Sequence, residues 1–323
     1  MRLAKPAFLV LILTVCGAFV CTGDGLPWLP EGAVSRMGMD EVEDLVFSHD
    51  GRYLAVAGST VIYLIDMEWQ QATASIPMVD GGLVLAVAFA PDKYVLTAGA
   101  YFAILRTWTV DVGATQMWSI EGGPHSTPVV SVAFSPDGRL LASGNGAGDV
   151  LLRDAMTGAA IRTLDVYNDS VTAIDFSPDG RLLATGGGPA QLWDLESGER
   201  LATLQERTGS AMTLDFSPDG SLLATGLDNV ALEVWNVATG ELHFAHRLED
   251  SVTDVAFSPD GTKLVAVEGG SLIHVYGAAT GLTLHLFVGH EDPVSAIAFS
   301  PDGATFVTGS IDGTLILWDA TAW

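Results

Sequence analysis

The sequence predicts an all-β protein built from seven repeated units, each of four antiparallel strands. Two observations predict this fold class. First, the motif Phe-Ser-Pro-Asp-Gly, or a looser copy, recurs at separations of 42, 45, 42, 40, 41 and 42 residues, with its phenylalanines at Phe47, Phe89, Phe134, Phe176, Phe216, Phe257 and Phe299. Second, runs of alternating apolar and polar residues fill each period and are divided by turn residues. A fixed period of this size indicates a repeat architecture.

One period shows the elements in order. Residues 171–176, VTAIDF, alternate as a strand does and precede a Ser-Pro-Asp-Gly turn. The second strand is predicted at residues 181–186 and the third at residues 190–194. A Ser-Gly turn then leads to a fourth strand at residues 199–204. The repeated region carries no helical period, so strands are expected throughout.

The repeated motif is interpreted as a turn. Pro presets the backbone for a type I turn, Asp tolerates the following position, and Gly takes a left-handed conformation. A calcium loop needs several converging oxygen ligands, whereas each copy of the motif supplies one acid. We therefore predict a structural role for the motif aspartates, which are Asp137, Asp179, Asp219, Asp260 and Asp302.

The composition limits the kinds of partner that the protein is expected to bind. The chain has 323 residues, of which 49% are apolar, enough for a large core. It carries 14 basic against 39 acidic residues, a net charge of −25. Such a charge repels nucleic-acid phosphates and anionic lipid, so both are excluded as expected partners. The acids are scattered rather than gathered in a tail, which indicates a folded acidic surface.

The N-terminal segment predicts export. Two bases precede the uncharged apolar run 7–20, whose 14 residues suit a signal peptide, assigned to residues 1–21 with a linker at 22–30. Cys16-Gly17-Ala18 offers a cleavage site, after which the mature chain would start near Phe19. An uncleaved anchor and lipid attachment at Cys21 stay open, although Val20 departs from a lipobox. Each alternative places the body outside the cytoplasm, as a secreted, periplasmic or outward-anchored protein. Both cysteines lie in this segment, so no cysteine chemistry is expected in the body.

Residues 289–319, GHEDPVSAIAFSPDGATFVTGSIDGTLILWD, end in Trp-Asp. With the period and the four-strand plan, this segment resembles a WD40 repeat, and the chain resembles an exported bacterial member of that family. The resemblance implies a single seven-bladed β-propeller, expected over residues 31–323. We number the blades 1 to 7 in the order of the phenylalanines and name the strands of each blade a to d. The family pattern implies a buried hydrogen-bonded tetrad at His290, Thr308, Asp312 and Trp318.

Blade 7 is the only blade whose sequence has the complete tetrad. Blade 3 has His125 and Ser143, but Ala147 and Arg153 replace the Asp and the Trp. The last predicted strand is strand c of blade 7, and residues 31–37 stand where a strand d would precede blade 1. We expect this segment to complete blade 7 and close the ring without an open edge.

No catalytic triad, phosphate-binding loop or dinucleotide fingerprint is present, and we expect no cofactor and no catalytic metal. His243 and His246 are three residues apart, which on a regular strand puts them on opposite faces and disfavours a zinc site. A structural calcium ion on the acidic loops is left open.

The loops from strand d to strand a, with the b–c loops, should share one face. Asp149, Asp228 and Glu268 are expected in b–c loops, and Arg207 is the one base placed on this face. The candidate partner-binding acids of the d–a loops are Asp40, Glu41, Asp80, Glu121, Asp165, Asp169, Glu206, Glu249, Asp250, Glu291 and Asp292. We predict a monomeric, non-enzymatic interaction or scaffold module whose acidic face binds a basic or cationic protein. The alternatives are acidity that serves solubility alone, and a hydrolase or lyase with a metal or carboxylate site in the central channel.

Overall fold

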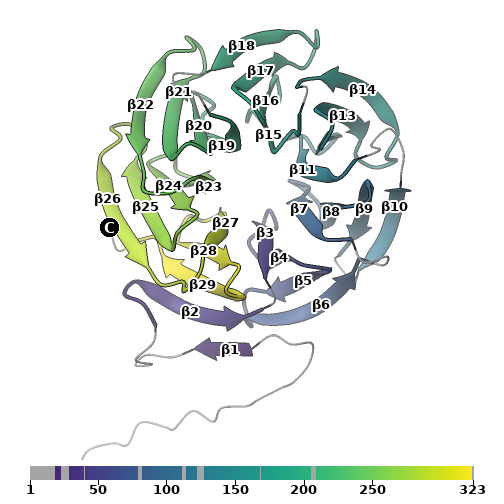
Figure 1. Cartoon of the computed structure of the whole chain (residues 1–323). Coiled ribbons are helices and arrows are strands. Elements are labelled where there is room, and N and C mark those ends of the chain that lie inside the picture. The colour runs from purple at the N-terminus through teal and green to yellow at the C-terminus, as the bar shows by residue number, and fades with distance from the viewer. Residues whose placement is uncertain are drawn as a thin grey trace, which may run out of the picture.

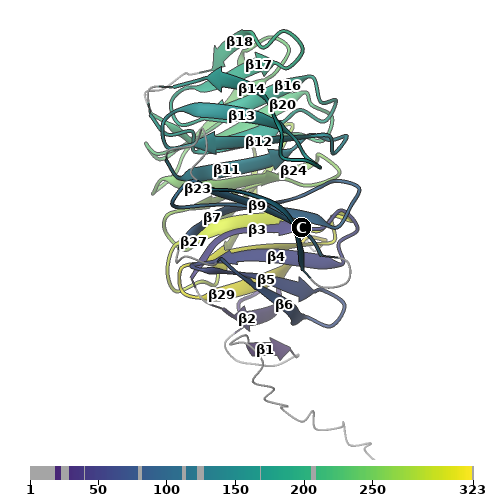
Figure 2. The same cartoon turned by 90° about the vertical axis from the view of Figure 1, so that its right-hand side faces the viewer.

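Seven antiparallel β-sheets surround a central channel in the computed structural model (Figure 1). The structure describes residues 19–22, 29–39, 41–78, 82–110, 114–121, 127–167, 169–204 and 209–321. Six sheets have four strands and one has five. Seen from the side, the blades form a disc (Figure 2). The predicted all-β propeller of seven four-stranded blades is confirmed, and the described residues contain no helix that could span a membrane.

The strands follow the order a, b, c, d in blades 1 to 3. Blade 1 consists of β3 (Val42–Phe47), β4 (Tyr53–Gly58), β5 (Val61–Asp66) and β6 (Gln71–Pro77). Blade 2 consists of β7 (Val84–Phe89), β8 (Val95–Ala100), β9 (Ile104–Thr109) and β10 (Thr115–Glu121). Blade 3 consists of β11 (Val129–Phe134), β12 (Leu140–Asn145), β13 (Asp149–Asp154) and β14 (Ala160–Asp165).

Blades 4 to 6 repeat this order, and blade 7 takes its outer strands from the N-terminus. Blade 4 consists of β15 (Ala173–Phe176), β16 (Leu182–Gly186), β17 (Ala190–Asp194) and β18 (Arg200–Leu204). Blade 5 consists of β19 (Ala211–Phe216), β20 (Leu222–Leu227), β21 (Ala231–Asn236) and β22 (Leu242–Arg247). Blade 6 consists of β23 (Val252–Phe257), β24 (Lys263–Glu268), β25 (Leu272–Gly277) and β26 (Thr283–Val288). Blade 7 consists of β27 (Val294–Phe299), β28 (Thr305–Ser310), β29 (Thr314–Asp319), β2 (Ala33–Gly38) and β1 (Phe19–Thr22).

The N-terminal segment closes the ring. Strand β2 pairs antiparallel with β29, with Met37 opposite Leu315, as expected for residues 31–37. The fifth strand, β1, pairs with the outer edge of β2 and was not predicted. Its first residue, Phe19, directly follows the predicted cleavage site. The rest of the predicted signal peptide and linker, residues 1–18 and 23–28, lies outside the described residues, so processing stays a prediction.

The motif turns join strands a and b through local hydrogen bonds. In blade 4, the Ser177 hydroxyl donates to Asp179 Oδ1 at 2.7 Å, and the same oxygen accepts the N–H of Arg181 at 3.0 Å. Gly180 has a φ of 68°, which a residue with a Cβ resists. These bonds lower the pKa of Asp179, with the Ser177 hydroxyl as the largest cause. The carboxylate is thus engaged in shaping its own turn.

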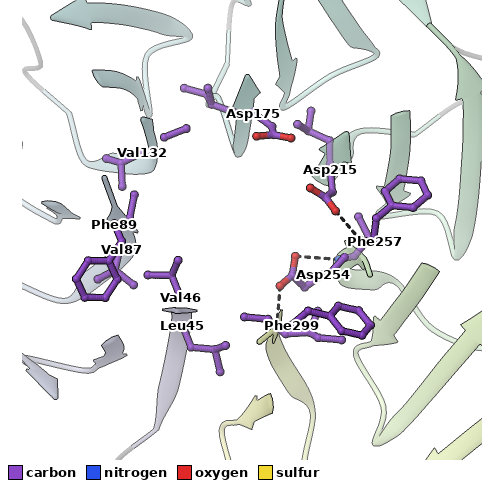
Figure 3. A pocket seen from close by; sticks show the side chains of 18 of the residues that line it. Leu45, Val46, Val87, Phe89, Val132, Asp175, Asp215, Asp254, Phe257 and Phe299 are labelled. Atoms are coloured by element: carbon purple, nitrogen blue, oxygen red, sulfur yellow. Dashed lines mark hydrogen bonds between the residues drawn. The ribbon is translucent and has the colours of Figure 1, made fainter. Parts of the chain in front are cut away.

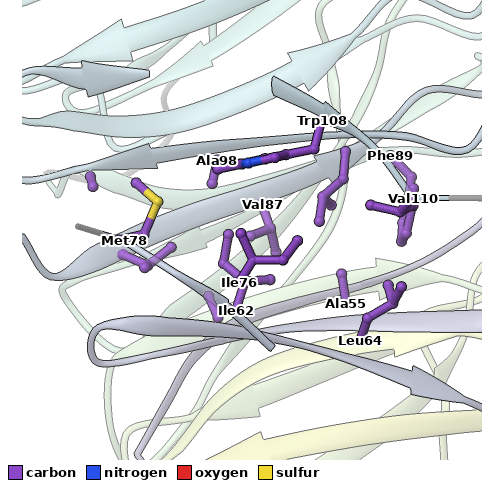
Figure 4. Close-up of a cluster of buried hydrophobic side chains, with 14 of the residues drawn as sticks. Ala55, Ile62, Leu64, Ile76, Met78, Val87, Phe89, Ala98, Trp108 and Val110 are labelled. Atoms are coloured by element: carbon purple, nitrogen blue, oxygen red, sulfur yellow. The ribbon is translucent and has the colours of Figure 1, made fainter. Parts of the chain in front are cut away.

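The core lies between neighbouring blades. Between blades 1 and 2, Ile62 and Leu64 pack with Val87 and Trp108 (Figure 4). Glycines on strand b allow the closest approach of the next blade. A Cβ on Gly309 would overlap Cγ1 of Val42, the first residue of strand a in blade 1. Glycines in the same place meet the next blade in a like manner at Gly99, Gly144, Gly186 and Gly226.

Candidate functional site

The central channel is lined by the a strands of all seven blades. A cavity of about 420 Å³ opens between them, and Asp175, Asp215 and Asp254 reach into it from blades 4, 5 and 6 (Figure 3). An adjoining cavity of about 280 Å³ is lined by Asp44 and Asp254. These four carboxylates lie within otherwise largely apolar strands. Sequence reasoning missed them, although they occupy alternate positions one or three residues before the motif phenylalanine.

Each channel carboxylate joins two blades. Asp215 Oδ2 accepts the backbone N–H of Phe257 at 2.6 Å, and Asp254 Oδ2 accepts that of Ile297 at 2.9 Å. Two further bonds of the same kind run from Val87 N–H to Asp44 and from Phe216 N–H to Asp175. In every case the N–H belongs to strand a of the following blade. Strand pairing leaves this N–H without a partner on the channel side, and the carboxylate accepts its hydrogen bond.

The channel raises the pKa of these acids. Burial raises the pKa of Asp175 to about 7 and that of Asp254 to about 6, from an ordinary value of 3.8. Burial also raises the pKa of Asp44 to about 7, and the charge of Asp254 adds to it. The pKa of Asp215 lies well above its ordinary value through burial first, and then through the charge of Asp175. The carboxyl groups are therefore partly protonated, and those that are ionised repel one another.

Each of the three acids on the larger cavity accepts a backbone hydrogen bond from the neighbouring blade. Both oxygens of Asp254 accept hydrogen bonds, because Oδ1 takes the Thr213 hydroxyl at 2.7 Å and the N–H of Val255. Within the described ranges, no group of three or more His, Cys, Asp or Glu could hold a metal ion. The channel carboxylates therefore bind backbone groups of the neighbouring blades.

The tetrad positions of blade 7 form one hydrogen-bonded chain. Nε2 of His290 lies 2.8 Å from Oγ1 of Thr308, which also accepts the indole N–H of Trp318 at 2.8 Å. Nδ1 of His290 lies 3.2 Å from Oδ2 of Asp312. Although burial opposes it, these hydrogen bonds hold the pKa of Asp312 far below its ordinary value, with His290 the largest lowering cause. The chain fixes the b–c turn against the loop that enters blade 7.

Other blades keep parts of this chain. The indole N–H groups of Trp193 and Trp235 donate to the strand-b threonines Thr185 and Thr225, each at 3.2 Å. Arg153 takes the Trp place in blade 3 and is 3% exposed. Its Nη1 donates to Gly158 O, while Nε and Nη2 have no hydrogen-bond partner among the described residues. His125 lies outside the described residues.

The predicted acidic residues are exposed wherever they are described. Asp40, Asp80 and Glu206 lie outside the described residues, as does Arg207. The remaining eight are all exposed and end strands d or lie in the d–a loops: Glu41, Glu121, Asp165, Asp169, Glu249, Asp250, Glu291 and Asp292. Arg207 is not the one base of this face, because Arg247 is exposed at the end of β22 beside the loop that carries Glu249. Two strand residues add bases that pair with its acids. Arg36 lies 3.5 Å from Asp312, and Arg106 Nη2 lies 2.6 Å from Glu121 Oε1.

Glu268 corrects a further expectation. The sequence predicts it in a b–c loop, but it is the last residue of β24 and is 1% exposed. Its Oε2 accepts the N–H groups of Glu249 and Asp250, each at 3.1 Å, and Oε1 lies 3.2 Å from His274 Nε2. The loop turns its backbone donors inward, and the buried carboxylate satisfies them. This cluster ties the d–a loop to the b–c turn in blade 6.

The placement of His243 and His246 on opposite faces is also wrong. A β-bulge at the β21–β22 pairing leaves His243 without a register partner. Nε2 of His243 therefore lies 3.1 Å from Ala279 O, and Nε2 of His246 lies 2.7 Å from Gly281 O, in one turn of blade 6. Both rings bind backbone carbonyls and support the junction between blades 5 and 6.

Parts of the chain match two family models and one known protein. Residues 198–231, 239–276 and 281–319 match the family model described as WD domain, G-beta repeat. Residues 106–179 match the model described as Anaphase-promoting complex subunit 4 WD40 domain. Over 78 residues the chain is 38% identical to the Intraflagellar transport protein 122 homolog of Xenopus tropicalis; this stretch is 24% of the chain and 6% of that protein, so the chain spans a small part of its length.

The whole chain resembles a solved propeller. One chain of a structure titled Crystal Structure of Mitotic Checkpoint Complex superimposes with a TM-score of 0.80 and 21% identity, covering 99% of this chain and 98% of that chain. The likeness shows the fold. The predicted WD40 repeats and seven-bladed propeller are confirmed. The bacterial origin gains no support, because the matched relative is from a eukaryote.

Proposed function

We propose that this propeller of WD40 repeats is an exported interaction module, and that the loops carrying its exposed acids bind a basic or cationic protein. The observation that carries the proposal is the imbalance of charge in those loops. Eight described acids are exposed there, against three described bases. Arg36 and Arg106 are each within ion-pair distance of an acid, and Arg247 is exposed at the end of strand d in blade 5. An unbalanced field of one sign attracts partners of the opposite sign and accelerates their encounter.

Export is supported by the segment before β1. The apolar run and the small residues before Phe19 fit a signal peptide, and cleavage there would leave β1 as the first element of the mature protein. N-terminal sequencing of the protein from its native cell envelope or medium tests this. A sequence that begins at Phe19 supports export with cleavage, and a cytosolic chain that retains Met1 contradicts it.

Binding by the acidic loops is tested with matched charge variants. We would replace Glu249, Asp250, Glu291 and Asp292 by their amides and measure the affinity for a synthetic oligo-lysine peptide. The control variant carries amides at Glu68, Glu196, Glu199 and Glu241, which are exposed near the c–d turns on the opposite face. Both variants change the net charge equally. The proposal predicts a loss of affinity of about tenfold or more in the first variant alone, and equal losses in both would reject a specific face.

A channel enzyme is the second candidate, and one observation favours it. Asp175, Asp215 and Asp254 share a cavity and have raised pKa values, as functional carboxylates often do. The test is a thermal melt with added calcium or manganese. Stabilisation that disappears in an Asp215→Asn variant supports a metal-dependent channel site. Stabilisation that persists in that variant but disappears after amidation of the four loop acids supports a calcium ion on the acidic loops.

A further inference from the structure

The b–c turn of blade 7 shows how such a turn is normally held. Asp312 Oδ1 accepts the N–H of Thr314 at 2.8 Å, and its Oδ2 accepts the N–H of Glu291 at 3.0 Å. The next residue, Gly313, has a φ of 75°. A capping carboxylate and a glycine together make this turn without strain.

Blade 2 has neither feature at the same positions. Phe102 stands in place of the Asp, and Ala103 stands in place of the Gly. Both residues are nevertheless left-handed, with φ values of 62° and 58°. A Cβ disfavours this conformation, so the turn is strained at two consecutive residues. Strain of this kind is concentrated at functional sites, where it holds side chains in a required position.

The strained turn holds two aromatic rings in solvent. Tyr101 is 46% exposed and Phe102 is 68% exposed, whereas Ala103 beneath them is 4% exposed. The N–H of Tyr101 donates to Leu83 O at 3.0 Å, which fixes the turn to the loop that enters blade 2. Exposed aromatic side chains are typical binding anchors, because they bury a large area on contact and have few rotatable bonds to fix.

A carboxylate lies beside this turn. Ile104, the first residue after it, is paired in register with Glu121 on β10. The Glu121 side chain is 55% exposed although it contacts Arg106. The exposed acids of the d–a loops belong to the same face of the propeller, because b–c turns and d–a loops lie at the same end of the strands. An aromatic face in a negative field favours a cation, and a planar guanidinium stacks on it better than an ammonium group does.

We propose that Tyr101 and Phe102 anchor the partner on the acidic face and select arginine side chains in it. This inference rests on the proposed function and adds residue specificity to it. The acidic loops attract a basic segment of the partner, and the two rings distinguish arginine from lysine within that segment.

The experiment compares two labelled peptides of equal length and charge, oligo-arginine and oligo-lysine, binding to the full chain. The test variant is Phe102→Asn with Ala103→Gly, because Asn-Gly adopts a left-handed turn without strain. The control is Trp69→Ser, which removes a ring that is 67% exposed in a c–d turn on the opposite face. A second variant, Tyr101→Ser with Phe102→Ser, removes the rings and leaves Ala103 in place.

We expect the wild type and the Trp69→Ser control to bind oligo-arginine about 2- to 5-fold more tightly than oligo-lysine. The Tyr101→Ser/Phe102→Ser variant should lose that preference, and the Asn-Gly variant, which keeps Tyr101, should show a weaker preference than the wild type. Both variants should keep their affinity for oligo-lysine. The Asn-Gly variant should also melt about 2–4 °C higher, since the strain is relieved. If the preference survives unchanged in the ring variants or is absent from the wild type, the rings do not select arginine, and binding by the acidic loops is not contradicted. If the wild type binds neither peptide, both the arginine selection and the proposed function are wrong.

Discussion

Oδ2 of Asp215 in blade 5 accepts the backbone N–H of Phe257 in blade 6 at a distance of 2.6 Å. Among the described residues, this bond is one of four in which a channel carboxylate accepts a backbone N–H from strand a of the next blade. The carboxylates support the ring by these bonds and destabilise it by their mutual repulsion. Several properties of the protein depend on that balance.

Stability should fall as the pH rises from about 4 to about 7. The folded-state pKa values of Asp175, near 7, and Asp254, near 6, exceed their ordinary value of 3.8. The native state therefore retains protons that the unfolded chain has lost, and unfolding becomes easier as the pH rises through this window. Below pH 4 the sign reverses, because the turn carboxylates Asp50 and Asp260 have a pKa of about 2 and stabilise the fold when ionised. Thermal melts across pH 2–8 should show the highest melting temperature near pH 4.

An Asp215→Asn variant should be more stable than the wild type at pH 7, by about 1–2 kcal/mol. The amide oxygen still accepts the Phe257 N–H, and the charge that faces Asp175 and Asp254 is gone. The exposed Asp165→Asn change serves as the control and should leave the melting curve unchanged. A destabilised Asp215→Asn variant at pH 7 would show that the ionised group is required, contrary to this explanation.

Gly309→Ala should destabilise the junction between blades 7 and 1 by about 1–3 kcal/mol. The added Cβ overlaps Val42, which is fully buried and β-branched, so the a strand of blade 1 must move. The control is Gly270→Ala, where a Cβ would have nothing within 4 Å. Chemical denaturation should separate the two variants clearly. Equal midpoints would mean that the ring does not close as tightly as the contact implies.

Arg153→Trp should stabilise blade 3 by about 1–2 kcal/mol. The change removes a buried guanidinium, whose pKa is lowered by its burial, and restores an indole that can donate to Ser143 as Trp235 does to Thr225. Arg153→Lys is the control, because it keeps a buried cation and should not stabilise. A lower melting temperature for Arg153→Trp would indicate that the site cannot accommodate the ring.

A truncated chain that lacks residues 31–37 should melt at a much lower temperature, or fail to fold. Without this segment, the edge of β29 is exposed. The core around Met37, which is 1% exposed in the intact protein, is uncovered as well. The comparison should be made with a chain that begins at Glu31. If the two chains melt together, strand β2 does not close the ring in solution.

The period and the turn residues were enough to predict the blades. Each repeat has the same alternation of apolar and polar residues, and nearly every repeat has a turn glycine that suits a left-handed conformation. The closing strand was also predictable, since an incomplete last blade requires one. Side-chain roles that depend on non-local contacts were not. Nothing near Glu268 in the sequence reveals that two backbone N–H groups from the preceding loop converge on it. Likewise, the face of His243 depends on a bulge that the alternation of β22 does not encode.

The channel acids were predictable in principle. Asp175 and Asp215 interrupt apolar runs at the same position, and Asp44 and Asp254 do so two residues earlier, on the same face of strand a. What the sequence could not supply is the partner of each carboxylate, which lies about 40 residues away in the next blade.

The most direct test of the acidic interaction face is the affinity of the full chain for a basic peptide as a function of salt. If the exposed loop acids attract the basic peptide by their charge, salt screens this attraction. The affinity should then fall steadily as sodium chloride increases from about 0.05 to 0.5 M. The slope should be shallower in the variant with amides at Glu249, Asp250, Glu291 and Asp292. Affinity that does not change with salt, or an identical slope in that variant, would contradict the proposal.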